Sequence, residues 1–103
     1  MNQQIFKEIQ ALKRRILPND KVILFGSQAR GDARSDSDWD LLVLLDSDST
    51  NLDDEIKYSY PFSKLGWDYD VDFNVLLYSK SDWEKRFFFP FYKNIMKEGI
   101  EIN

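Results

Sequence analysis

The chain of 103 residues contains no cysteine and no histidine. Without cysteine it can form no disulfide and offers no thiolate nucleophile. Without histidine it lacks the commonest general base and the commonest zinc ligand. Thiol chemistry and histidine-based catalysis are therefore excluded.

Long apolar runs are also missing. No run approaches the roughly 18 to 20 residues that a helix needs to cross a bilayer. The first ten residues, MNQQIFKEIQ, lack the apolar core of a signal peptide. We therefore expect a soluble, cytoplasmic protein with no membrane partner.

The sequence has less positive charge than nucleic-acid-binding proteins usually carry. Fourteen lysines and arginines face 18 acidic residues, and the formal net charge is −4. The longest basic run, Lys13-Arg14-Arg15, is typical of the solvated face of a helix. Because binding to phosphate backbones depends on a basic surface, we expect no direct nucleic-acid partner.

Hydrophobic periodicity predicts one α/β (α+β) domain over residues 1–103, with helices around a small mixed sheet. One predicted strand, at 69–77, would place Val71, Phe73, Val75 and Leu77 on one face. The predicted elements are a helix at 2–17, a strand at 22–25, a short helix at 28–30, a strand at 39–45, a helix from 51 or 53 to 65 that Gly66 ends, the strand at 69–77, a helix at 81–88 and, after Pro90, a helix at 91–98.

Asp38 and Asp40 stand at the start of the second predicted strand, in the segment DWDLLVLL. Side chains two apart on a strand share a face, so these residues would point the same way, with Cα atoms roughly 6.6 Å apart. At that spacing two like charges repel by about 3 kcal/mol at an effective dielectric constant near 20. A hard divalent cation such as Mg²⁺ would offset the repulsion.

The segment from Gly26 to Leu45, GSQARGDARSDSDWDLLVLL, resembles the signature of the minimal nucleotidyltransferase domain in the DNA polymerase β-like superfamily, as in MntA-type antitoxins. That signature is Gly-Ser, ten residues, then Asp-x-Asp. Its longer form is G-S-x-A-R-G, a spacer and S-D-x-D-L-x-V. Ten positions of an 18-residue span agree: Gly26, Ser27, Ala29, Arg30, Gly31, Ser37, Asp38, Asp40, Leu41 and Val43.

The resemblance implies a mechanism with two Mg²⁺ ions and ATP as substrate, with Asp38 and Asp40 as metal ligands. It also implies a third carboxylate on a neighbouring strand. Asp72 matches that position best, with a role in catalysis and metal binding. Asp70 is the alternative, because alternation along the predicted strand gives Asp68, Asp70 and Asp72 the same parity.

The Gly26-Ser27 turn is the predicted site for the triphosphate. A glycine lets backbone N–H groups approach an anion, and the hydroxyl of Ser27 can donate to a phosphate oxygen. Arg30 would either contact a phosphate or form a salt bridge with the Asp-rich loop; the sequence supports both interpretations.

The resemblance further implies the transfer of AMP from ATP to a tyrosine of a helical HEPN-domain RNase toxin, for which this chain would act as antitoxin. Two alternatives remain open. The chain could neutralise its partner by contact alone, or it could be a subunit that modifies a small molecule such as an aminoglycoside. The aromatic run Phe87–Tyr92 (FFFPFY) could be core packing around a bend at Pro90 or a partner surface.

Overall fold

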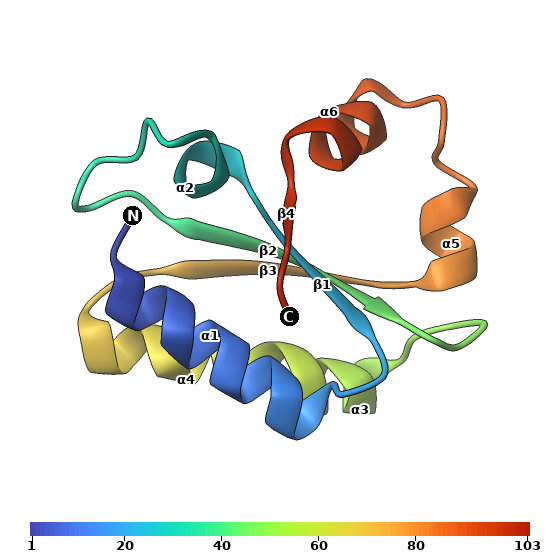
Figure 1. The fold of residues 1–103 in the computed structure, drawn as a ribbon. Coiled ribbons are helices and arrows are strands. Elements are labelled where there is room, and N and C mark those ends of the chain that lie inside the picture. Colours follow the sequence, from blue (N-terminus) through green and yellow to red (C-terminus); the bar gives the residue numbers. More distant parts are fainter.

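The computed structural model describes all residues 1–103, and a four-stranded mixed sheet lies at its centre (Figure 1). The strands are β1 (Lys21–Phe25), β2 (Trp39–Leu45), β3 (Phe73–Ser79) and β4 (Ile100–Glu101), in the order β3-β2-β1-β4. β1 pairs antiparallel with β2 and β4, and β2 pairs parallel with β3. The predicted mixed α/β architecture is confirmed.

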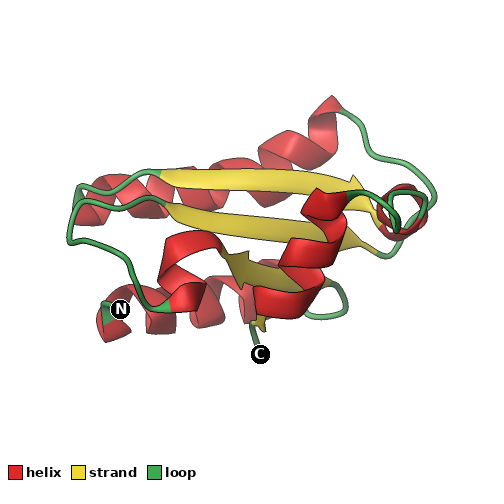
Figure 2. Ribbon diagram, turned by 90° about the horizontal axis from the view of Figure 1, so that it is seen from above, coloured by secondary structure: helices red, strands yellow, loops and turns green.

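Helices cover both faces of the sheet (Figures 1 and 2). One face carries α1 (Gln3–Ile16) and a continuous helical segment made of α3 (Leu52–Asp54), the π-helical turn η1 (Glu55–Ser59) and α4 (Tyr60–Tyr69). The other face carries α2 (Gly26–Arg30), α5 (Lys80–Glu84) and α6 (Pro90–Glu98). None of these helices is long and apolar enough to cross a membrane.

The main core lies between the sheet and the α1/α4 layer. Asn2 is the N-cap of α1, and its side chain accepts hydrogen bonds from the backbone N–H groups of Gln4 and Ile5. Alternation along each strand sends every second residue into this core. Its buried members are Ile5, Ile9, Leu12, Leu17, Val22, Leu24, Trp39, Leu41, Val43, Leu45, Phe62, Phe73 and Ile102.

A second, smaller core lies under α5 and α6. Trp83 and Ile95 from these helices pack on the opposite side of the sheet, against Ile23, Leu42 and Leu44. This cluster occupies only part of that face. The polar side chains that start β2 and β3 on the same face therefore stay accessible.

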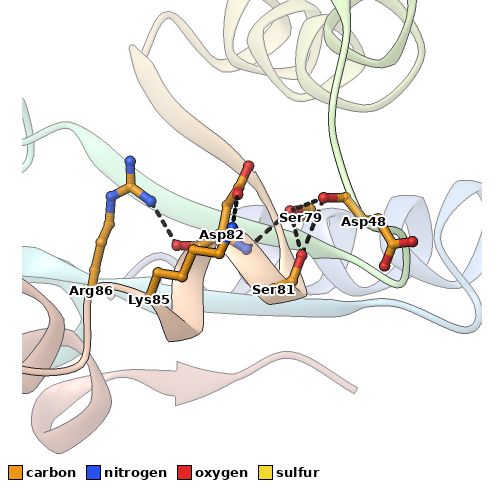
Figure 3. Close-up of polar contacts among 6 residues, drawn as sticks. All are labelled: Asp48, Ser79, Ser81, Asp82, Lys85 and Arg86. Atoms are coloured by element: carbon orange, nitrogen blue, oxygen red, sulfur yellow. Dashed lines mark hydrogen bonds and ion pairs between the residues drawn. The ribbon is translucent and has the colours of Figure 1, made fainter.

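The chain returns from β3 into α5 through a small polar network (Figure 3). The backbone carbonyl of Asp48 accepts hydrogen bonds from the hydroxyls of Ser79 and Ser81, at 3.3 and 3.1 Å. Ser79 also caps α5 by accepting from the N–H of Asp82. The network closes the sheet at the end of β2 and β3 that lies away from Asp38 and Asp40.

The structure differs from the predicted elements in several places. β3 starts at Phe73 rather than at residue 69, because α4 continues to Tyr69. The predicted helix at 81–88 is shortened to α5, and Pro90 begins α6 at its first turn instead of interrupting a helix. The two-residue strand β4 was not predicted at all, since two residues give no periodicity.

The aromatic run Phe87–Tyr92 does not form core as a whole. Phe87, Phe88 and Phe89 are each more than half exposed. Phe91 and Tyr92 contact the ring of Trp83, but only Tyr92 packs against the smaller core, and Phe91 stays 48% exposed. Core packing therefore explains Tyr92 and not the run as a whole.

Gly66 lies inside α4 and does not end it, contrary to prediction. The chain folds back over this residue, and the N–H of Val71 donates to the Gly66 carbonyl at 3.0 Å. A Cβ on Gly66 would lie 2.5 Å from the Val71 carbonyl oxygen. Gly66 is thus required by the close return of the backbone into β3.

We expect Gly66→Ala to lower the free energy of unfolding by about 1–3 kcal/mol, the usual cost of overpacking. Alanine favours a helix by about 1 kcal/mol over glycine, but the collision with a backbone carbonyl is the larger effect. Urea denaturation measures the change. A more stable variant would contradict the close return of the chain over α4.

Candidate active site

The two halves of the sequence motif meet where β1 ends and β2 begins. Phe25 pairs with Asp40 in the antiparallel ladder, so the turn at Gly26 lies beside the Asp38–Asp40 segment. Asp40 shares a sheet face with Leu42 and Leu44, which contact the α5/α6 core. The carboxylates therefore lie on the sheet face that also carries α2 and α6.

Gly26 is in direct contact with one of these carboxylates. Its φ of +74° is in the left-handed region, and a Cβ there would lie 2.2 Å from Oδ2 of Asp40. No side chain can occupy that space while Asp40 keeps its position. The conformation of the turn at Gly26 and the position of the Asp40 carboxylate therefore depend on each other.

Asn74 holds the two carboxylates together. Its side-chain Nδ2 donates to Oδ2 of Asp38 and to Oδ1 of Asp40, each at 3.0 Å. These two oxygens are therefore within about 6 Å of each other, as strand spacing predicts. Asn74 is opposite Asp40 in the parallel β2/β3 ladder, which explains its reach.

Sequence reasoning missed Asn74. It searched the third strand for a carboxylate and did not consider an amide two residues after Asp72. Alternation along the strand could have pointed to Asn74, because residues 72 and 74 lie on the same side of a strand that starts at Phe73. The register with β2, which puts residue 74 beside Asp40, was not available from sequence.

The side-chain amide of Asn74 reduces the repulsion between the carboxylates of Asp38 and Asp40 but does not neutralise their negative charge. Hydrogen bonds to charged groups contribute about 1.5–3 kcal/mol when sheltered, and less at an exposed site such as this. One oxygen of each carboxylate binds Asn74, and the second oxygen has no hydrogen-bond partner within the chain. Two neighbouring carboxylates with free oxygens fit a hard cation such as Mg²⁺.

Asp72 is next to this pair in the fold, but only its backbone is engaged. Its carbonyl accepts from the N–H of Trp39 at 2.9 Å, and its side chain is exposed. No group of three carboxylate, imidazole or thiolate side chains is close enough to hold a metal ion together. The structure thus brings Asp38 and Asp40 together, and the third ligand role of Asp72 stays a prediction.

The two other acids of the same parity lie elsewhere. Asp70 caps the end of α4 in a left-handed conformation, with φ 54°. Asp68 is on α4 and lines a hollow of about 430 Å³ between α1 and α4, on the opposite face of the sheet. Neither residue belongs to β3, which starts only at Phe73, so alternation along a strand cannot relate the three acids. Asp72 is the acid nearest β3.

α2 presents Ser27 one residue after the turn at Gly26. The neighbouring Gln28 is buried, and its side-chain amide donates to the Ser37 carbonyl at 3.3 Å. This bond ties the loop before Asp38 to α2. Gln28 is a second positioning residue that sequence reasoning did not identify.

Arg30, on α2, forms two ion pairs, one of them with α6. Its Nε is 3.4 Å from Asp32, and a terminal guanidinium nitrogen is 3.6 Å from Glu98 on α6. The salt bridge to the Asp-rich loop is present, as one of the two predicted interpretations has it. Arg30 also borders a cavity of about 310 Å³ that reaches Gly26 and Phe91 between α2 and α6.

We expect Asn74→Ala to reduce activity at this site by about 10- to 100-fold, the range found when residues that orient metal ligands are removed. Without the amide the carboxylates repel each other and separate. Initial rates measured across a Mg²⁺ titration test this. Unchanged rates at every Mg²⁺ concentration would show that Asn74 has no part in positioning Asp38 and Asp40.

Comparison with known proteins agrees with this geometry. The model of the family described as "Nucleotidyltransferase domain" matches residues 4–102. The chain belongs to the nucleotidyltransferase domain family. A protein of Methanocaldococcus jannaschii named "Putative protein adenylyltransferase MJ0604" is 35% identical over 79 residues, which cover 77% of this chain and 73% of that protein. A second protein of that organism, "Putative protein adenylyltransferase MJ0141", is 37% identical over 62 residues, 60% of this chain and 62% of the relative.

Solved structures share the fold of this nucleotidyltransferase domain. A toxin–antitoxin structure with AMP-PNP superposes on the whole chain and on 73% of its own chain, with a TM-score of 0.64 and 21% identity. A complex of tri-AMPylated Shewanella oneidensis HEPN toxin with MNT antitoxin gives a TM-score of 0.60, with 19% identity, over the whole chain and 72% of its own. The predicted nucleotidyltransferase fold is confirmed.

Proposed function

We propose that this chain transfers AMP from ATP to a tyrosine hydroxyl of a partner protein, a HEPN-domain RNase toxin, and so acts as its antitoxin. The pairing of Asp38 and Asp40 beside the Gly26-Ser27 turn is the observation that carries the proposal. The curated relatives are named as protein adenylyltransferases, and structures of the same fold contain a HEPN toxin. ATP, Mg²⁺ and an RNase substrate would meet in the cytoplasm.

The reaction needs positioning and charge neutralisation more than covalent help. The tyrosine oxygen attacks the α-phosphorus of ATP, a new P–O bond forms, and the bond to the β-phosphate oxygen breaks. Pyrophosphate leaves, and the hydroxyl proton passes to a carboxylate, for which Asp72 is our candidate. Gly26 and Ser27 would hold the leaving phosphates through backbone N–H groups and the serine hydroxyl, with Arg30 as a further phosphate contact.

Asp38 and Asp40 would hold Mg²⁺, joined by Asp72 when two ions bind. Bound Mg²⁺ would neutralise charge on the phosphates and on the departing pyrophosphate. The chain's own part is to keep two carboxylates adjacent, through Asn74, and to keep one of them against the turn, through Gly26. Both contacts are made by the chain's own residues.

Mass spectrometry of the co-expressed HEPN protein tests the transfer. We expect AMP on tyrosine with the wild-type chain and none with an Asp38→Asn, Asp40→Asn double variant. If the double variant still protects cells from the toxin, the chain neutralises its partner by contact. Transfer to an aminoglycoside without any partner protein would instead make this a small-molecule enzyme.

Ligand binding should also raise thermal stability. At 100 times its dissociation constant a ligand that binds only the folded state adds about 2.7 kcal/mol. We therefore expect millimolar Mg²⁺ with a nonhydrolysable ATP analogue to raise the melting temperature, and either ligand alone to raise it less. No shift with both present would argue against a nucleotide site.

A further inference from the structure

The outer side of helical segment 52–69 carries large apolar side chains that nothing in the chain covers. Leu52, Ile56, Tyr60 and Trp67 are 75%, 60%, 50% and 65% exposed, and we call them the outer stripe. The other side of the same segment is packed, because Phe62 and Gly66 are buried in the fold. A surface helix normally turns polar residues outward, so this segment is apolar on two sides.

The outer stripe is nearly straight because of η1. In an α-helix residues four apart are offset around the axis, since one turn takes 3.6 residues. The wider π-helical turn at Glu55–Ser59 reduces this offset for Leu52, Ile56 and Tyr60. Single π turns are rare and occur frequently at functional sites.

The middle of the outer stripe is hollowed. A depression of about 450 Å³ lies between Ile56 and Tyr60 and is also lined by Ser59 and Ser63. Two short serine side chains leave room there for apolar side chains from outside. Farther along, Tyr60 and Trp67 meet edge to face at 5.8 Å, which makes a stable aromatic end to the stripe.

Charges beside the outer stripe favour a basic partner over a second copy of this chain. Three acids at the start of the segment, Asp53, Asp54 and Glu55, outnumber the one lysine there, Lys57. Lys57 is already paired with an acid of the same segment, because its ammonium nitrogen lies 2.8 Å from a carboxylate oxygen of Asp53. The hydrogen bond to Asp53 raises the pKa of Lys57. Two copies would bring two acidic flanks together in a chain of net charge −4.

We propose that the outer stripe docks an amphipathic helix of the acceptor protein, with lysines or arginines flanking its apolar side. The inference rests on the proposed function for the identity of the acceptor. The stripe belongs to the layer of α1, α3 and α4, which lies across the sheet from α2, α5 and α6 (Figure 1). Asp40 shares the face of Leu42 and Leu44, which pack under α5 and α6. Docking there holds the acceptor while the active site stays open to ATP and to the tyrosine.

Trp67 makes docking measurable. It is the exposed tryptophan of three, because Trp39 and Trp83 are 2% and 0% exposed. Titration with the purified HEPN protein proposed as acceptor should shift Trp67 emission to shorter wavelength, and the dissociation constant should rise with salt. An Ile56→Gln, Leu52→Gln double variant keeps the probe and should bind at least tenfold more weakly. Met96→Gln, at an exposed apolar residue of α6 outside the stripe and outside the aromatic run, is the matched control and should bind as the wild type does.

The outcomes separate docking from catalysis. Equal binding of the double variant and the wild type, or no complex at all, overturns the docking proposal. Sedimentation that shows a wild-type dimer dissociated by the double variant also overturns it, in favour of a second copy as occupant. Stripe-dependent binding without AMP transfer keeps the docking proposal and refutes the proposed function.

Discussion

Asp38→Asn is expected to reduce AMP transfer by about 10³-fold while leaving the ligand-free protein as stable as before or slightly more so. Lewis-acid stabilisation by a bound metal contributes several kcal/mol to a transition state, and each 1.36 kcal/mol is a factor of ten in rate. Asp38 is exposed and belongs to a pair of like charges. Removing its charge therefore relieves repulsion without opening a cavity.

Transfer of labelled AMP and the melting temperature in EDTA measure the two effects in the same samples. Asp36→Asn is the matched control, since Asp36 is an exposed acid of the same loop that makes no hydrogen bond with the carboxylate pair. We expect it to retain wild-type activity and stability. An Asp38→Asn protein that unfolds at a much lower temperature would mean that Asp38 is structural and that the activity loss is indirect.

The melting temperature of the Asp38 variant should no longer depend on Mg²⁺. In the wild type, added Mg²⁺ would offset the repulsion between the two carboxylates that the hydrogen bonds from Asn74 relieve only in part. With one carboxylate neutral, the preference for a divalent cation falls. The difference between the Mg²⁺ and EDTA samples thus separates metal binding from general stability.

The carboxylate pair and the Gly-Ser turn could be predicted because their geometry is local. Asp38 and Asp40 share a face by strand alternation, and Gly26 follows directly from β1. The position of residue 72 relative to them is not local. It depends on where α4 ends, which was mispredicted, and on the parallel register of β3 with β2, which the sequence did not predict.

Gly66 shows why that boundary failed. Glycine after a helical pattern usually marks the end of the helix, and the prediction followed this rule. Here Gly66 serves the close approach of Val71, a contact between segments that no local pattern encodes. The helix then runs one more turn, and the strand begins at Phe73 with Asn74 against the carboxylates.

The role of Asn74 could not be predicted from the sequence for a related reason. Asn74 can bind both carboxylates because it lies opposite Asp40 in a parallel ladder. Parallel strands are joined by a long crossover, so their pairing is not visible in a short stretch of sequence. Such a register is set by packing of α4 and the core, not by the residues of the strand itself. The same holds for Gln28, whose burial follows from how the loop after α2 folds over it.

Gly26→Ala is expected to have the other large effect, a loss of activity of about 10²-fold or more with a folded protein. The new methyl group would lie 2.2 Å from Oδ2 of Asp40, so either the carboxylate or the turn must move. A displacement of about 1 Å at a reacting site can cost 10²-fold. The left-handed φ of +74° adds backbone strain of about 1–3 kcal/mol.

Gly31→Ala separates these two contributions. Gly31 also has a left-handed φ, +86°, but a Cβ there would meet nothing within 4 Å. Both variants should therefore lose comparable stability from backbone strain, and only Gly26→Ala should lose most of its activity. Denaturation curves and transfer rates of the two proteins, measured together, decide the matter. Equal activity losses would mean that turn conformation matters and that contact with Asp40 does not, because the strain is shared and the contact belongs to Gly26 alone.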